Sequence, residues 1–320
     1  MFSITEIAKI PPGAVWSIHG VTIAGGMGKG SNRSRLNNPN GIRVTRQQSV
    51  IIADTMNHRI IECNLLTMQG KVLVGNGIAG YLNGNLCKPM DVYFDSHTQT
   101  YIVSDGHNRE VSQYAVGKTN KIGSIAENLR ARGIAVDSNG NVYICDAERH
   151  EVRRYGPGCG DDGTLVAGGN GQGNRLHQLN YPTYVFVDAK LSLYISDSHN
   201  NRVVRWDDGA RRGVVVAGGH GTDRNLNQLF YPTGLVVDEL NTIYVADHWN
   251  HRIMRWYKDA TEGEIILGNR YRAGDQSDHL SGPQGLAFDQ YGNLYVADSN
   301  NHRIQRFNIR KFERSLCSDP

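Results

Sequence analysis

Residues 50–60 read VIIADTMNHRI, and five further segments repeat this phrase along the chain. They are YIVSDGHNREV (101–111), VYICDAERHEV (142–152), LYISDSHNNRV (193–203), IYVADHWNHRI (243–253) and LYVADSNNHRI (294–304). The aspartates of successive segments lie 50 or 51 residues apart, except for one interval of 41 residues between the second and the third. Self-similarity at a fixed period of this length is typical of solenoids and propellers.

Each repeat unit reads as four short strands. An apolar run such as GLVVD (234–238) leads through a turn into a second run, NTIYVAD (241–247), which ends at the repeated aspartate. A third run such as RIMRWY (252–257) follows, and a fourth run such as VVVAGG (214–219) ends in glycines. Strands that are apolar on both faces need cover on both sides, and four-stranded sheets arranged radially cover one another. The sequence therefore predicts an all-β fold, a six-bladed β-propeller with four-stranded blades.

The first and last strands of the chain do not coincide with the first and last strands of a repeat unit. The chain begins with a strand of the fourth type, VTIAGG (21–26), and ends with one of the third type, RIQRFNI (303–309). We expect the N-terminal strand to complete the last blade, because this removes two free sheet edges. The expected organisation is an N-terminal tail at 1–14, the propeller at 15–310 and a C-terminal tail at 311–320.

The segments ADTMNHRI, ADHWNHRI and ADSNNHRI resemble the NHL repeat, and the resemblance covers roughly residues 15–310. It implies a six-bladed NHL propeller, a module that often selects protein or RNA targets within larger proteins, including RING-type ubiquitin ligases. This sequence has no RING-like set of cysteines and histidines, so ligase activity would require another domain or chain. The second and third units depart from the pattern, because Glu110 and Glu151 replace the arginine of the other units.

The repeated polar residues fit a structural role. Short polar side chains between two strands bond nearby backbone groups and cap turns, and an arginine can pair with an acid or a carbonyl group. We expect this role for the residues that recur in register, namely Asp54, Asp105, Asp146, Asp197, Asp247 and Asp298 together with Arg59, Arg202, Arg252 and Arg303. A functional site should instead break the symmetry of the repeat.

An enzyme is the alternative function. The stretch from Leu86 to Asn108 resembles peptide-amidating lyases, which hold zinc with histidines just after a proline at the start of inner strands. No histidine occupies the corresponding positions here, which are Asn40, Met90, Arg132, Thr183, Thr233 and Gln284. A calcium site of the hydrolase type would have only Asp91 and Asn40, fewer than the six to eight ligands calcium prefers. The sequence therefore disfavours a metal-dependent lyase or hydrolase and predicts no metal, cofactor, small-molecule substrate or catalytic residue.

Composition and charge restrict the partners. Lys and Arg exceed Asp and Glu by only three charges, which is too near neutrality to mark the chain as a nucleic-acid binder. No apolar run reaches the roughly 18–20 residues of a membrane span, and we expect no membrane contact. The first residues lack a secretory pattern and the five cysteines form no C-x-x-C pair, so the cytoplasm is favoured although the compartment stays open.

The remaining candidate is one face of the propeller. In each unit the loop between the second and third strands and the loop to the next unit lie on the same face. These loops carry more cationic than acidic residues and a tryptophan among unlike neighbours. We predict that this face binds a macromolecule, most readily a protein, with RNA or an acidic peptide as further candidates, and that the chain is a monomer. The predicted contact residues are Arg33, Arg35, Arg130, Arg132, Trp249, His107, His199 and Tyr184.

Overall fold

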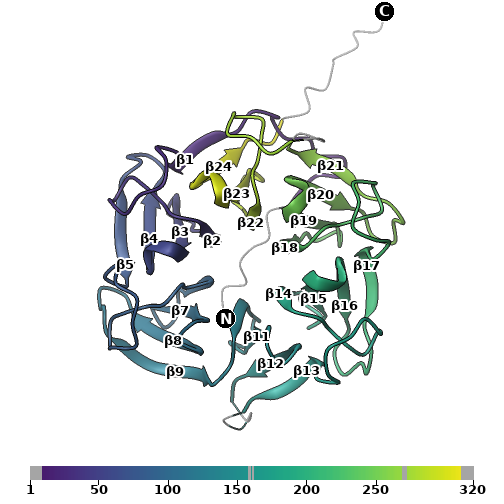
Figure 1. Ribbon diagram of the computed structural model, residues 1–320, viewed down its shortest axis with the longest axis horizontal. Helices are drawn as coiled ribbons and strands as arrows, with labels where there is room; N and C mark the ends of the chain where they lie inside the picture. The colour runs from purple at the N-terminus through teal and green to yellow at the C-terminus, as the bar shows by residue number, and fades with distance from the viewer. Residues whose placement is uncertain (1–8, 158–159, 161, 269–271, 311–320) are drawn as a thin grey trace, which may run out of the picture.

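The computed structural model describes residues 9–157, 160, 162–268 and 272–310. In this part of the chain, six four-stranded antiparallel sheets stand radially around a central axis (Figure 1). The described helical segments are four single 3-10 turns: η1 (Thr55–Asn57), η2 (Ser198–Asn200), η3 (His248–Asn250) and η4 (Ser299–Asn301). The predicted all-β, six-bladed propeller is confirmed. None of the helical segments in the described part is long and apolar enough to cross a membrane.

The strands of each blade follow one another from the axis outward. Blade 1 consists of β2 (Pro39–Val44), β3 (Ser49–Asp54), β4 (Arg59–Asn64) and β5 (Gly70–Val74). Blade 2 consists of β6 (Asp91–Asp95), β7 (Thr100–Asp105), β8 (Glu110–Ala115) and β9 (Lys121–Glu127). Blade 3 consists of β10 (Ala131–Val136), β11 (Val142–Asp146), β12 (Glu151–Tyr155) and β13 (Thr164–Gly168).

The second half of the ring repeats this order. Blade 4 consists of β14 (Pro182–Val187), β15 (Leu193–Asp197), β16 (Arg202–Trp206) and β17 (Val214–Gly218). Blade 5 consists of β18 (Pro232–Val237), β19 (Ile243–Asp247), β20 (Arg252–Trp256) and β21 (Glu264–Leu267). Blade 6 consists of β22 (Pro283–Phe288), β23 (Leu294–Asp298), β24 (Arg303–Phe307) and β1 (Val21–Gly25).

The N-terminal strand closes the ring as predicted. Strand β1 pairs antiparallel with β24, with Val21 opposite Arg306 and Gly25 opposite Arg303. The outermost strand of blade 6 therefore comes from the N-terminal part of the chain, and the other three strands of this sheet come from its C-terminal part (Figure 1).

Residues before β1 also pack against the ring. Trp16 is buried in the apolar cluster between blades 5 and 6, and its indole Nε1 donates a hydrogen bond to the carbonyl of Gly292 at 2.8 Å. Ile10 and Ala14 belong to the same cluster, so the described residues of the expected N-terminal tail contact the propeller. Residues 1–8 of that tail and the expected C-terminal tail, 311–320, lie outside the described residues.

One turn geometry recurs between the first and second strands of four blades. In blade 3, Asp137 Oδ1 accepts hydrogen bonds from the backbone N–H groups of Asn139 and Asn141, both at 2.9 Å. The same pattern recurs at Asp188, Asp238 and Asp289. An aspartate that bonds the backbone two residues ahead closes a tight turn, so the register of the inner two strands repeats from blade to blade.

Apolar side chains fill the space between neighbouring blades. Val152 and Ala167 of blade 3, for example, pack with Ile195 and Trp206 of blade 4. Burial on both faces explains the continuous apolar runs of the second and third strands. The polar residues that do not fit this pattern lie at the strand ends, on the face described next.

Candidate functional site

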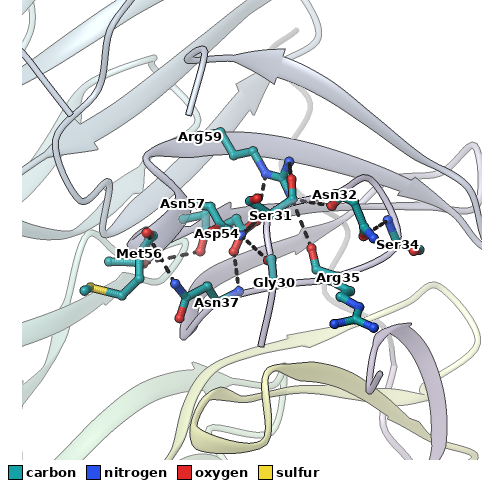
Figure 2. A network of polar contacts seen from close by, with 12 residues as sticks. Gly30, Ser31, Asn32, Ser34, Arg35, Asn37, Asp54, Met56, Asn57 and Arg59 are labelled. Carbon is teal, nitrogen blue, oxygen red and sulfur yellow. Dashed lines mark hydrogen bonds and ion pairs between the residues drawn. The ribbon is translucent and has the colours of Figure 1, made fainter. Parts of the chain in front are cut away.

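The repeated Asp–Asn–Arg residues hold the loops between blades in place (Figure 2). Asp54 Oδ1 accepts the N–H of Asn37 at 2.8 Å, and its Oδ2 accepts Asn57 Nδ2 and Arg59 Nε, both at 2.8 Å. The Arg59 guanidinium also donates to the loop carbonyl groups of Ser31 at 2.6 Å, Asn32 at 2.9 Å and Arg35 at 3.0 Å. The Asp54–Arg59 ion pair is buried, and both carboxylate oxygens and all three guanidinium nitrogens take part in hydrogen bonds.

Blades 4, 5 and 6 repeat this network. The Arg Nε to Asp Oδ2 distance is 2.8 Å for Arg202 and Asp197, and 2.7 Å both for Arg252 with Asp247 and for Arg303 with Asp298. Burial raises the pKa of each of these aspartates, while the asparagine, the arginine and a backbone N–H oppose that rise. These side chains are engaged within the fold and leave little for a ligand.

Blades 2 and 3 lack the arginine, and their aspartates differ accordingly. Asp105 keeps the N–H of Cys87 and the amide of Asn108, both at 2.8 Å, but Glu110 pairs outward with Lys121 at 2.7 Å. Burial raises the pKa of Asp105 to about 7. In blade 3 the buried Oδ2 of Asp146 has no hydrogen-bond partner among the described residues.

The histidines that follow the motif link neighbouring blades. His58, His251 and His302 have positive φ angles of 52°, 57° and 54°. Their Nδ1 atoms accept the backbone N–H of Lys88, Gly282 and Asn38, each at 3.1 Å. Burial is the main reason that the pKa of all three histidines is lowered, which suits a neutral ring that accepts a hydrogen bond. Each of these histidines therefore ties the motif loop of one blade to the strand entry of the next.

Four of the predicted contact residues gather around the mouth of the central channel. The mouth face is the side of the propeller that carries the loops between second and third strands. On this face, the guanidinium groups of Arg130 and Arg132 lie 5.8 Å and 5.3 Å from the ring centre of Tyr181. Tyr181 stacks on His199 with ring centres 4.5 Å apart and an angle of 8° between the planes.

The aromatic contacts continue into blade 5. His199 lies 5.6 Å from Tyr231, and Tyr231 lies 6.5 Å from Trp249, measured between ring centres. Trp249 remains 48% exposed, and its neighbour Phe230 39% exposed. We call Arg130, Arg132, Tyr181, His199, Tyr231 and Trp249 the mouth cluster. It spans blades 3, 4 and 5 and has no counterpart of like composition in the other three.

Other predicted contact residues lie elsewhere. Arg33 belongs to the loop that fills the outer wedge between blades 6 and 1, where it lines a hollow with Gly70 of β5. Arg35 is in the same loop and offers its carbonyl to Arg59. Tyr184 is buried in the channel, where its hydroxyl donates to Asn40 Oδ1 at 2.7 Å. His107 is exposed in the loop between the second and third strands of blade 2. Its pKa is lowered by partial burial and by the positive charges of Lys88, Arg130 and Arg132.

Sequence reasoning missed Tyr181 and Tyr231. Both stand directly before the proline that opens an inner strand, and both have a positive φ, 58° and 56°. The zinc-binding histidines of lyases would stand after that proline, whereas these two tyrosines stand before it. Comparing the residues before it, which are Asn38, Lys88, Arg130, Tyr181, Tyr231 and Gly282, reveals two tyrosines beside two cations.

The mouth carries positive potential. Burial lowers the pKa of His199 and His107, and the charge of Arg132 contributes to both shifts. Burial also lowers the pKa of His248 to about 4, again with a contribution from Arg132. These histidines are therefore neutral at pH 7, and the positive charge at the mouth comes from the arginines and Lys88.

The channel below the mouth is narrow. A Cβ atom on Gly133 would lie 2.7 Å from the carbonyl oxygen of Thr183, so glycine allows β10 and β14 to approach closely. Tyr184 spans the axis to Asn40, and Asp91 is buried in an ion pair with Arg43 at 3.1 Å. The two candidate calcium ligands are thus each engaged with a protein partner. Among the described residues, no group of three or more His, Cys, Asp and Glu side chains is placed to hold a metal ion.

Comparison with known proteins agrees with this architecture. The NHL repeat family model matches residues 129–155, 231–255 and 280–307, which cover the inner three strands of blades 3, 5 and 6 except for Trp256 at the end of β20. Protein SUPPRESSOR OF QUENCHING 1, chloroplastic, from Arabidopsis thaliana is 24% identical over 326 residues. The alignment covers 87% of this chain and 26% of that protein, so the chain spans about a quarter of its relative's length.

Solved structures share the fold at low sequence identity. An auxiliary nutrient binding protein from Bacteroides thetaiotaomicron is 12% identical with a TM-score of 0.69, over 96% of this chain and 76% of that one. A catalytically inactive virginiamycin B lyase from Staphylococcus aureus with quinupristin is 13% identical with a TM-score of 0.52, over 88% and 99% of the two chains. Similar folds therefore include binding proteins and an enzyme. The chain is thus a six-bladed β-propeller in which three segments match the NHL repeat family model.

Proposed function

We propose that this chain is a non-catalytic recognition propeller that binds a macromolecular partner, in the first place a protein, on its mouth face. The observation that carries the proposal is the mouth cluster. Its side chains break the symmetry of the repeat, whereas the repeated Asp, Asn and Arg residues are engaged in holding loops.

The composition of the cluster suits a protein contact. Tryptophan, tyrosine and arginine are the residue types that most often dominate binding energy at protein interfaces. Trp249 and Phe230 keep 48% and 39% of their surface exposed although both are large and apolar. The neighbouring rings of Tyr231 and His248 hold Trp249 in place, since they lie 6.5 Å and 4.8 Å from it. A rigid exposed ring loses little conformational entropy when a partner covers it.

Quantitative affinity capture from extracts of the cells that make the protein tests this function. The test variant is Trp249→Ala with His199→Ala. The matched control is Leu66→Ala with Tyr291→Ala, which removes exposed side chains from turns at the opposite ends of the strands. We expect proteins that the wild type and the control retain and that the mouth variant loses.

Two further arms separate the alternatives. Nuclease treatment before capture removes partners that are held through RNA, so retention after treatment favours a direct protein contact. Capture that is equal for all variants would contradict a partner site at the mouth. Elemental analysis of the purified protein addresses the enzyme alternative, because one equivalent of zinc or calcium per chain would favour a metal-dependent reaction over recognition alone.

A further inference from the structure

We propose that Arg132 anchors a carboxylate of the partner, so that the segment entering the mouth is an acidic stretch of protein. This inference rests on the proposed function and specifies its chemistry. Arg132 stands directly after the first position of its inner strand. The equivalent residues of the other blades are Asn40, Met90, Thr183, Thr233 and Gln284, so Arg132 is the one charged residue of this ring.

The guanidinium of Arg132 is held in place without a carboxylate. Its Nη1 lies 3.4 Å from Met90 Sδ, and its central carbon, Cζ, lies 5.3 Å from the ring centre of Tyr181. Burial raises the pKa of Tyr231, and the charge of Arg132 together with a hydrogen bond from it opposes that rise. Among the described residues, Arg132 forms no ion pair, whereas the buried arginines Arg59, Arg202, Arg252 and Arg303 each pair with an aspartate.

This contrast makes Arg132 a candidate to pair with a carboxylate supplied by the partner. A cation that is partly withdrawn from water is costly unless an opposite charge offsets the lost hydration. The channel carboxylate Asp91 is fully buried and already pairs with Arg43. An arriving carboxylate can meet both N–H groups of one guanidinium edge, which is the strongest form of such a contact.

The surroundings favour a carboxylate with an apolar neighbour. Asn40, Thr183, Tyr184 and Gln284 line the narrow end of the channel beside Arg132, where no space for a water molecule remains. The hydrogen bond between Tyr184 and Asn40 closes its floor. Beside it, Tyr181, Tyr231 and Trp249 form a wall on which an apolar or aromatic side chain of the same segment can pack.

RNA fits this arrangement less well. Strand-tracking nucleic-acid sites use a groove with many cations, because each phosphate contact adds only a salt-dependent share. The mouth offers Arg130, Arg132 and Lys88 over one sector, and Arg33 and Arg35 are in the outer wedge rather than beside them. A single anchored carboxylate needs only one guanidinium.

Defined probes test the anchor on the intact chain. The first probe is a peptide of alternating Glu and Trp residues, the second is the same peptide with Gln in place of Glu, and the third is oligouridine. The second variable is the protein: wild type, Arg132→Gln, and Arg211→Gln as a control from an exposed turn at the far end of blade 4. Gln is a conservative choice, because Gln284 and Asn40 carry amides at the equivalent position.

Two readouts are combined. One is the affinity from Trp249 fluorescence, since the other tryptophans, Trp16, Trp206 and Trp256, are buried. To avoid overlap with peptide tryptophan, the Glu–Trp peptides are replaced by Glu–Tyr versions in this measurement. The other readout is the pKa of His199 and His107 by NMR. We expect the acidic peptide to raise both values, because a bound carboxylate offsets the field of Arg132.

The outcomes are distinct. We expect the Glu peptide to bind wild type and the Arg211 variant equally, and to bind Arg132→Gln at least tenfold more weakly, as is usual when one partner of a desolvated charge pair is removed. The Gln peptide should bind all three proteins weakly. Equal binding of both peptides, equal binding by Arg132→Gln, or binding of oligouridine alone would overturn the anchor. If proteins are still captured through Trp249 in any of these cases, the recognition function stands and only its acidic chemistry falls.

Discussion

The buried ion pair of blade 5 offers the most direct test of how the repeat stabilises the ring. Arg252 and Asp247 are 1% and 0% exposed. The substitution Arg252→Met keeps most of the side-chain volume and removes the charge. It deletes the bond from Nε to Asp247 Oδ2 at 2.7 Å and the bonds from the guanidinium to the carbonyl groups of Arg224, Asn225 and Gln228 at 2.8, 3.1 and 3.1 Å.

The size of the effect follows from what remains. Asp247 keeps Asn250 Nδ2 at 2.9 Å and the N–H of Phe230 at 2.7 Å but loses its only opposite charge within the network. Removing one member of a buried ion pair typically lowers the free energy of unfolding by about 3–5 kcal/mol. The matched control is Arg109→Met, whose 2.6 Å contact with Glu148 is about half exposed on both sides. An exposed pair of this kind contributes about 0–1 kcal/mol.

Urea unfolding at pH 7.5, followed by tryptophan fluorescence, measures both variants. Arg252 is the largest of the influences that oppose the rise of the Asp247 pKa, so its loss should raise that pKa further. The deficit of the variant should therefore shrink as the pH falls, because Asp247 can then take up a proton. The double variant Asp247→Asn with Arg252→Met should lose less than the single one, because no charge stays buried. A loss no larger than that of the control, or a deficit that is independent of pH, would refute the reasoning.

Two predictions concern the blades and histidines that carry titrating groups. Burial raises the pKa of Asp105 from 3.8 to about 7, so its contribution to stability is present below pH 4 and is lost as the pH rises through 7. The substitution Asp105→Asn should therefore flatten the fall in unfolding free energy between pH 4 and 7. An unchanged slope in urea titrations would contradict this. For His251 the pKa is lowered, so the contribution is present above pH 6.5 and is lost as the pH falls below it. His251→Ala should cost about 1 kcal/mol at pH 7.5, the usual worth of one hydrogen bond. His251→Asn should retain the bond, as Asn201 does to the N–H of Tyr231 at 2.9 Å, but lose the acid sensitivity, which thermal melts at pH 5.5 and 7.5 can separate.

The amino-acid sequence was sufficient for the architecture, because the fold repeats a local pattern. Six segments with similar continuous apolar runs and the same aspartate before the turn can bury their strands in only a few ways. The phase of the first and last strands also predicted closure, since an unpaired β1 and β24 would leave two sheet edges open. These conclusions depend on neighbours in the chain or on register, which the sequence displays directly.

The histidine contacts and the mouth cluster required the tertiary structure. His58 bonds the N–H of Lys88, 30 residues along the chain and in the next blade, and no local pattern reveals that partner. Likewise, Arg132 and Trp249 lie far apart in sequence and share a surface only because blades 3, 4 and 5 bring the ends of their loops to one mouth. The sequence also predicted Arg33 and Arg35 as contact residues of the same face as Arg132 and Trp249. The loop before β2 that carries them instead packs in the outer wedge between blades 6 and 1. The direction of a loop depends on the residues it packs against, and these neighbours come together only when the ring closes.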